Sequence, residues 1–101
     1  MDDIVQLCNK HALRWTSHIL ERIFRRGIST GDVENALTNG KIIERYPNDY
    51  PFPSYLVLGY TMTGRIIHVV CGSNGVELWL ITAYFPDPAE WSDDFKQRKI
   101  K

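Results

Sequence analysis

Apolar residues recur along this chain with two different periods, and the change from one to the other falls near Lys41. Before this point they return every three or four positions, which is the spacing of an amphipathic helix. From Lys41 onward they form short runs rich in β-branched and aromatic residues, separated by glycine, proline and asparagine. That second pattern is typical of strands joined by turns. The sequence therefore predicts helices first and strands afterwards.

Three helices are expected before the strands begin. They cover residues 2–10, a segment from Thr16 or Ser17 to about Arg26, and a segment from Ser29 to Asn39-Gly40. Gly27 lies where a C-terminal glycine cap belongs, and Asp32 is placed to complete a capping box with Ser29. Leu13 to Trp15 is expected to be a brief extended link. The second and third helices should form an αα-hairpin.

The second helix has an apolar and a charged side. The apolar stripe, which is expected to be buried, consists of Ile19, Leu20, Ile23 and Phe24. At about 100° per residue the opposite side carries His18, Glu21, Arg22 and Arg25. Two interpretations of this side are open. It is a solvated surface with local pairs such as Glu21 with Arg25, or it grips a phosphate through arginine donors and a titratable histidine.

Four strands are expected after the helices, over residues 41–46, 55–60, 65–71 and 76–85. Three prolines within residues 47–54 exclude that segment from the interior of a sheet. The result is one α+β domain over residues 1–101, with the helices packed on one face of a mostly antiparallel sheet. A family-like core spans about residues 13–91, and Trp91 is expected to anchor a helical turn in the polar tail.

The turn at Asn74-Gly75 leaves two strand registers open. A two-residue turn puts His68 on the face away from Tyr84. A three-residue loop over residues 73–75 puts His68 and Tyr84 on the same face. Because side chains alternate along a strand, this single residue of slip decides whether the two residues meet.

The charge balance and the cysteine content limit which partners and which cellular compartment are expected. Twelve basic and twelve acidic side chains cancel, so any contact with nucleic acid is expected to be local. Cys8 and Cys71 have no metal-ligand spacing and are expected to be reduced. With no apolar leader after Met1 and no run of about 18 apolar residues, we expect a cytoplasmic protein without a membrane partner.

His68 and Tyr84 are further candidates for chemistry. His68 lies within an apolar run, where it is either a satisfied core residue or a neutral histidine able to act as a base. Tyr84 either hydrogen-bonds a phosphate or closes one end of the core. The sequence contains no glycine-rich phosphate loop, nucleophile elbow or zinc pattern. We therefore expect no metal and no cofactor.

Several short motifs follow one another in a fixed order. In the first half they are Thr16-x-His18-x-x-x-Arg22-x-x-x-Arg26-Gly27-Ile28-Ser29, Asp32-Val33, Asn39-Gly40-Lys41-Ile42-Ile43-Glu44, Tyr46-Pro47 and Asp49. In the second half they are Leu56-x-Leu58-Gly59, Gly64-Arg65-x-x-His68-Val69-Val70 and Ile81-Thr82-x-Tyr84-x-Pro86-Asp87-Pro88-x-x-Trp91. Over about residues 13–91 this ordered set resembles the small bacterial proteins grouped as domain of unknown function 4258.

The resemblance implies a fold related to the compact α+β ribonuclease toxins of the RelE and MqsR kind. Such toxins are metal-free, cleave messenger RNA and are silenced by an antitoxin, so RNA and an antitoxin-like protein are the implied partners. By position in the motifs, the implied site residues are His18, Arg22, Arg26, His68 and Tyr84. One histidine would act as general base on the ribose 2′-hydroxyl, the arginines would stabilise the phosphate and the tyrosine would orient it.

A non-catalytic binding module is the alternative, recognising a protein or a nucleic acid. Its contact surface would consist of the aromatic residues around the proline-rich loop, Tyr46, Tyr50, Phe52 and Tyr55. Aromatic side chains are enriched where proteins bind partners. The neutral overall charge favours this alternative, because toxins of the RelE and MqsR kind are often strongly basic.

Overall fold

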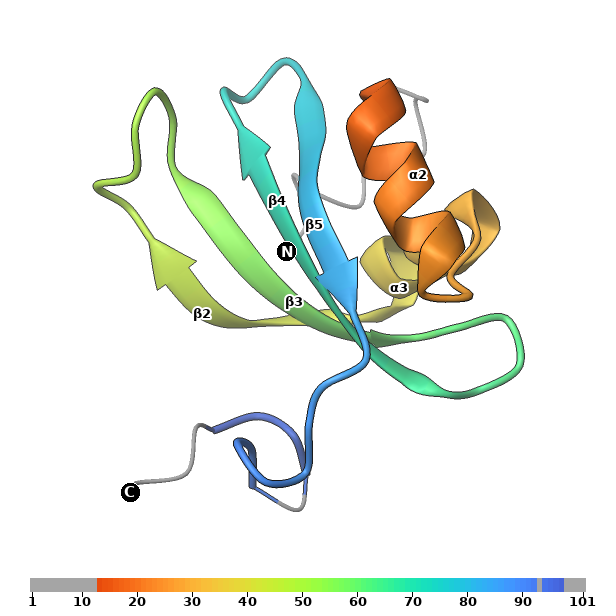
Figure 1. Cartoon of the computed structure of the whole chain (residues 1–101). Coiled ribbons are helices and arrows are strands. Elements are labelled where there is room, and N and C mark those ends of the chain that lie inside the picture. The colour runs from red at the N-terminus through yellow and green to blue at the C-terminus, as the bar shows by residue number, and fades with distance from the viewer. Residues whose placement is uncertain (1–12, 93, 98–101) are drawn as a thin grey trace.

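A computed structural model describes residues 13–92 and 94–97. In chain order its elements are β1 (Leu13–Arg14), α2 (Ser17–Arg25), α3 (Thr30–Asn39), β2 (Lys41–Tyr46), β3 (Ser54–Tyr60), β4 (Ile66–Ser73) and β5 (Leu78–Tyr84). The two helices lie beside a twisted sheet, and the C-terminal segment leaves the end of β5 away from them (Figure 1). The α+β class is confirmed, whereas the helix expected over residues 2–10 lies outside the described residues.

The sheet has five strands in the order β1-β5-β4-β3-β2. The four expected strands are present and pair with antiparallel neighbours. The expectation of a mere link at Leu13–Trp15 was wrong, because Leu13 and Arg14 pair in parallel with Leu78 and Trp79. Two residues are too few to show a recognisable alternation of apolar and polar positions. This strand forms by pairing with β5, which is distant in sequence, so it could not be predicted from the local pattern.

The helix ends follow the capping residues. The Ile19 amide donates to the Thr16 hydroxyl over 3.2 Å at the start of α2. Gly27, with φ at 75°, ends that helix as predicted. The Ser29–Asp32 capping box is also present, with both of its hydrogen bonds at 3.0 Å. Local sequence therefore sets the boundaries of the αα-hairpin.

The main core lies between the helices and one face of the sheet. It is formed by apolar side chains of both helices and of four strands, including Ile19, Ile23, Val33, Leu37, Val57, Ile67, Val69, Leu78, Leu80 and Ala83. The prediction that Leu20 and Phe24 are buried was wrong, since they are 38% and 82% exposed. The helix α2 contacts β5 near the edge of the sheet, so the sheet covers only the narrow stripe of Ile19 and Ile23.

The other helix packs very closely on the sheet. A Cβ atom at Gly59 of β3 would lie 2.5 Å from the Cα atom of Ala36 in α3. Glycine is therefore required at this position for the helix to approach the strand. This close approach helps to hold the helices on one face of the sheet, as predicted.

The β4–β5 connection is a four-residue loop over residues 74–77, so neither of the two expected registers is present. The Asn74 side chain accepts hydrogen bonds from the amides of Val76 (2.9 Å) and Glu77 (2.8 Å), which closes this longer loop. Further along, a β-bulge leaves Ile81 without a partner in the ladder. Together, the four-residue loop and the bulge at Ile81 place His68 directly opposite Tyr84.

Asp32 connects α3 to the loop between β3 and β4. Its carboxylate accepts hydrogen bonds from the Ser29 amide (3.0 Å) and the Met62 amide (2.9 Å). These bonds, that from Ser29 first, hold the pKa of Asp32 below its usual value. We expect Asp32→Ala to lower the free energy of unfolding by about 1 kcal/mol at pH 7. Glu90→Ala, which removes the same charge from an exposed site, should have little effect.

The pH dependence of this difference is a second test of the same contact. A carboxylate with a lowered folded-state pKa contributes stability above its unfolded pKa and loses it as the pH falls through the folded pKa. Urea unfolding of wild type and Asp32→Ala should therefore differ most near pH 7 and converge between about pH 5 and pH 2. A difference that stays constant over this range would contradict the assignment.

Candidate functional site

His68 is completely buried in the middle of β4. Its neighbours Ile67 and Val69 belong to the core beneath the helices. Because strand residues alternate, His68 points to the other face of the sheet. On that face it lies between Leu58 of β3 and Tyr84 of β5.

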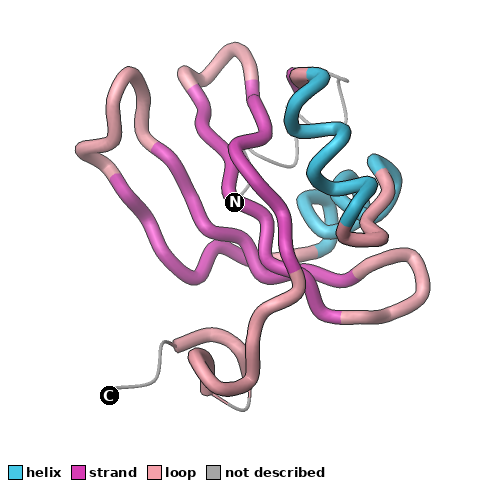
Figure 2. The backbone as a smooth tube through the Cα atoms, in the orientation of Figure 1, coloured by secondary structure: helices cyan, strands magenta, loops and turns pink. Residues whose placement is uncertain are grey.

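The segment after β5 covers His68. The expected helical turn is present as a single turn, in which the Trp91 amide donates to the Asp87 carbonyl over 3.2 Å, and the segment is drawn as loop in Figure 2. Trp91 does anchor it, being 2% exposed with its ring centroid 4.4 Å from that of His68 at 86°. The Tyr84 ring makes a second edge contact at 5.4 Å. Aromatic side chains thus enclose the imidazole on two sides.

The hydrogen bonds of the imidazole indicate which of its nitrogens carries a proton. The Phe95 carbonyl oxygen lies 2.8 Å from Nε2, and a carbonyl only accepts, so Nε2 carries the proton. On the neutral ring, Nδ1 then accepts a weak hydrogen bond from the Tyr84 hydroxyl over 3.4 Å. Both nitrogens are engaged, and the ring is closed to solvent. In this conformation neither nitrogen is available to take a proton from a substrate.

Arg26 lies at the edge of the same strand pair. Its Nη1 atom donates to the Ala83 carbonyl over 2.8 Å and to the Thr82 hydroxyl over 3.1 Å. Among the described residues, β1 pairs with β5 only at Leu78 and Trp79. The Arg26 guanidinium lies further along the same edge of β5, at Thr82 and Ala83. The structure therefore brings Arg26 to the end of β5 that carries Tyr84.

His18 and Arg22 lie elsewhere. Both are exposed on α2, which packs on the sheet face opposite to His68. On the same side of α2, Arg25 donates to Glu21 over 2.6 Å, which is the local i,i+4 pair expected of a solvated helix. The five predicted site residues thus form two groups, and the sheet separates His18 and Arg22 from His68 and Tyr84.

Sequence reasoning missed Phe95, which contacts His68 through its backbone. A carbonyl oxygen has no signature in a residue pattern, although Trp91 at the end of the last motif pointed to this segment. Within residues 13–92 and 94–97, no three histidine, cysteine, aspartate or glutamate side chains are grouped to hold a metal ion. None of the helices in this described part has the length and apolar character that crossing a bilayer requires.

One comparison with known proteins gives a match. A family model described as a domain of unknown function (DUF4258) matches residues 15–85 of the 101. The matched range contains all five predicted site residues and ends before Trp91 and Phe95. No curated protein and no solved structure shows significant similarity to the chain. The relationship to RelE and MqsR toxins therefore stays a prediction.

The contacts of His68 predict a structural role for its ring. His68→Ala would leave a cavity at a fully buried position and would deprive the Phe95 carbonyl of its donor, so we expect a loss of about 2–4 kcal/mol in the free energy of unfolding. Tyr84→Phe keeps the ring and removes the long hydrogen bond to His68, and it should cost about 1 kcal/mol or less. His18→Ala, an exposed control, should change stability by less than about 0.5 kcal/mol. Equal losses for His68→Ala and His18→Ala in urea unfolding would contradict this role.

Proposed function

The chain belongs to the family described as domain of unknown function DUF4258, and we propose that it acts as a non-catalytic protein-binding module. The contact surface is the exposed apolar stripe of α2, defined here as Leu20 and Phe24. The observation that carries this proposal is the exposure of the Phe24 ring, 82% of which is open to solvent on a well-capped helix.

Leu20 and Phe24 lie four residues apart and form an apolar stripe on α2 beside the buried one. Burying a phenylalanine side chain in a partner is worth about 1.5–3 kcal/mol. An aromatic side chain that enters a pocket is the usual anchor of a protein interface. The stripe therefore provides an anchor that the core of this chain does not use.

Charged side chains border the stripe on one side only. At about 100° per residue, His18 and Arg22 project from the far side of α2, whereas Glu21 and Arg25 lie between them and the stripe and pair with each other over 2.6 Å. The stripe therefore presents a mainly apolar surface, and a protein partner with an apolar pocket would complement it. Because the chain as a whole has no net charge, such a partner suits it better than a long polyanion.

The proline-rich loop offers less contact surface than its sequence indicates. Tyr50 is 95% exposed, but the ring of Phe52 already makes an edge contact with Trp79 at 5.1 Å. Tyr55 packs against the main core, and Tyr46 is half-buried. Only one of the four rings is thus largely available, which favours α2 as the contact surface.

A photo-crosslinking residue in place of Phe24 tests this proposal in cells. It should capture one protein that the same residue in place of Met62, which is 72% exposed, does not capture. With that protein purified, Phe24→Ala should weaken binding by about tenfold or more, while Met62→Ala should change it by less than about twofold. Binding that Phe24→Ala leaves intact, or crosslinks to RNA at position 24, would overturn the proposal.

A metal-free endoribonuclease of the RelE and MqsR type is the second candidate. One observation favours it, namely that Tyr84, His68 and Arg26 gather at one end of β5. RNA would be the substrate and an antitoxin-like protein the inhibitor. For His68 to act as the general base, the Phe95 carbonyl would first have to leave Nε2, because a base needs an unoccupied nitrogen.

RNA cleavage distinguishes the two candidates. The full-length chain is incubated with messenger RNA in the presence of a chelator, as wild type and as Arg26→Ala, Arg22→Ala and His68→Gln. The first proposal predicts no cleavage above background and no growth arrest when the protein is induced alone. Cleavage by wild type that Arg26→Ala abolishes and the control Arg45→Ala retains would instead establish the second candidate.

A further inference from the structure

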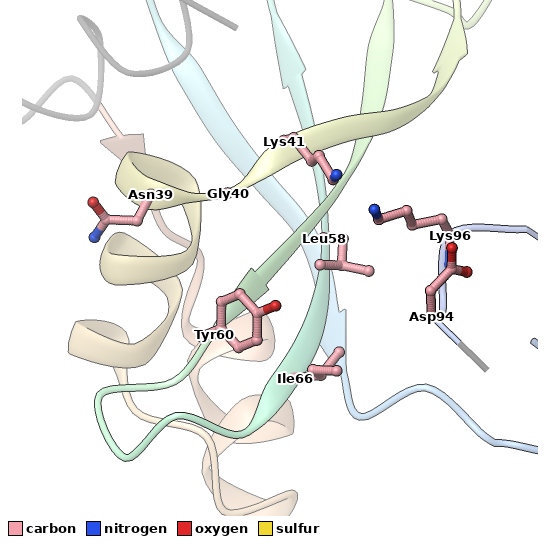
Figure 3. Close-up of a pocket in the computed structure, with 8 residues that line it drawn as sticks. All are labelled: Asn39, Gly40, Lys41, Leu58, Tyr60, Ile66, Asp94 and Lys96. Atoms are coloured by element: carbon pink, nitrogen blue, oxygen red, sulfur yellow. The ribbon is translucent and has the colours of Figure 1, made fainter. Parts of the chain in front are cut away.

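A pocket lies on the sheet face that carries His68, at the side of the sheet where β2 begins. It has a volume of about 420 Å³. Leu58 and Ile66 line its apolar floor, and Tyr60 lies at its side (Figure 3). Leu58 is the residue opposite His68 in the β3–β4 ladder, so the pocket adjoins the buried imidazole. Its volume is within the range of pockets that hold small organic ligands.

Two lysines from distant parts of the sequence meet at the mouth of this pocket. Lys41 begins β2, Lys96 comes from the C-terminal segment, and their ammonium groups point toward one another (Figure 3). Contact with Lys96 lowers the pKa of Lys41, because a neutral Lys41 amine can accept a hydrogen bond from the Lys96 ammonium and because two ammonium charges repel each other. Two cations held this close repel each other, and an anion between them would remove that cost.

Negative groups near the pocket limit where an anion can bind. The Asp94 carboxylate also lines it, and it already accepts hydrogen bonds from the Ser92 hydroxyl (2.6 Å) and the Lys96 amide (3.1 Å). The C-terminal end of α3 at Asn39 contributes the negative end of a helix dipole. The position between the two ammonium groups is therefore the one that suits an anion.

We propose that this pocket binds a phosphate monoester, with the phosphate between the Nζ atoms of Lys41 and Lys96 and an apolar or aromatic body against Leu58, Ile66 and Tyr60. A dianionic phosphate matches two ammonium groups better than a carboxylate with a single charge. The aromatic ring at the side suits the planar base of a nucleotide, since bases stack on aromatic side chains. Two sources share this chemistry, a free nucleotide and the 5′-phosphorylated end of a nucleic-acid strand.

This site is separate from the proposed contact surface on α2. The helix α2 packs on the opposite face of the sheet, so changes at Phe24 leave the pocket residues in place. Lys96 and Asp94 both belong to the segment that Trp91 and Phe95 fasten over His68. A bound phosphate monoester should therefore also stabilise that segment, because a ligand that binds only the folded arrangement favours it.

Titration of the full-length chain with a nucleoside 5′-monophosphate at low salt tests the site, with binding followed by calorimetry and by shifts of the Leu58 and Ile66 methyl resonances. Lys41→Ala and Lys96→Ala should each weaken binding by about tenfold, and Lys41→Arg should retain most of it. Arg45→Ala, which removes an exposed cation from the same strand, is the matched control and should change the affinity by less than about twofold. Thermal unfolding of each variant verifies that it is folded.

Further probes test whether the phosphate is required and distinguish a free nucleotide from a strand end. The unphosphorylated nucleoside should bind at least about tenfold more weakly than its monophosphate. A 5′-phosphorylated oligonucleotide that binds more tightly than the free nucleotide supports a strand end, and the reverse order supports a free nucleotide. Equal weakening by Arg45→Ala and Lys41→Ala would overturn the proposal, as would the absence of saturable binding of every phosphorylated probe at millimolar concentration.

Discussion

One extra residue in β5 determines which side chains share a face of the β4–β5 pair. The loop register pairs Ser73 with Leu78, and continued without interruption it would place Ala83 opposite His68. The bulge at Ile81 shifts this pairing by one residue, so that Tyr84 takes the position instead. As a result Ala83 packs in the main core, while His68 and Tyr84 face the C-terminal segment. The second face of the sheet thereby gains a small core of its own, which Trp91 closes.

This arrangement gives the two faces of the sheet different roles. On the helix side, α2 buries a narrow apolar stripe and leaves Leu20 and Phe24 exposed for a partner. On the other side, His68 holds the C-terminal segment through the Phe95 carbonyl, and that segment brings Lys96 to the pocket beside Lys41. A histidine whose polar atoms are satisfied by the protein contributes to structure rather than to proton transfer.

The sequence predicted those parts of the fold that depend on local chemistry. The capping box at Ser29 could be recognised because cap and helix are adjacent in sequence. β1 could not, since two residues carry no period and their partner strand is far along the chain. Periodicity also identified the apolar side of α2 correctly but not how much of it the sheet covers, so Phe24 was misplaced. The contact of His68 with a backbone carbonyl at Phe95 depends on tertiary packing alone.

The protonation state of His68 is the most direct measure of whether the C-terminal segment is fastened to the sheet through its ring. Long-range proton–nitrogen NMR correlations of the imidazole report which nitrogen carries the proton. The structure predicts a neutral ring with the proton on Nε2, visible as a sharp signal that exchanges slowly with solvent because the Phe95 carbonyl accepts it in a buried site. A mixture of both tautomers, or an Nε2 proton lost to rapid exchange with water, would contradict this account.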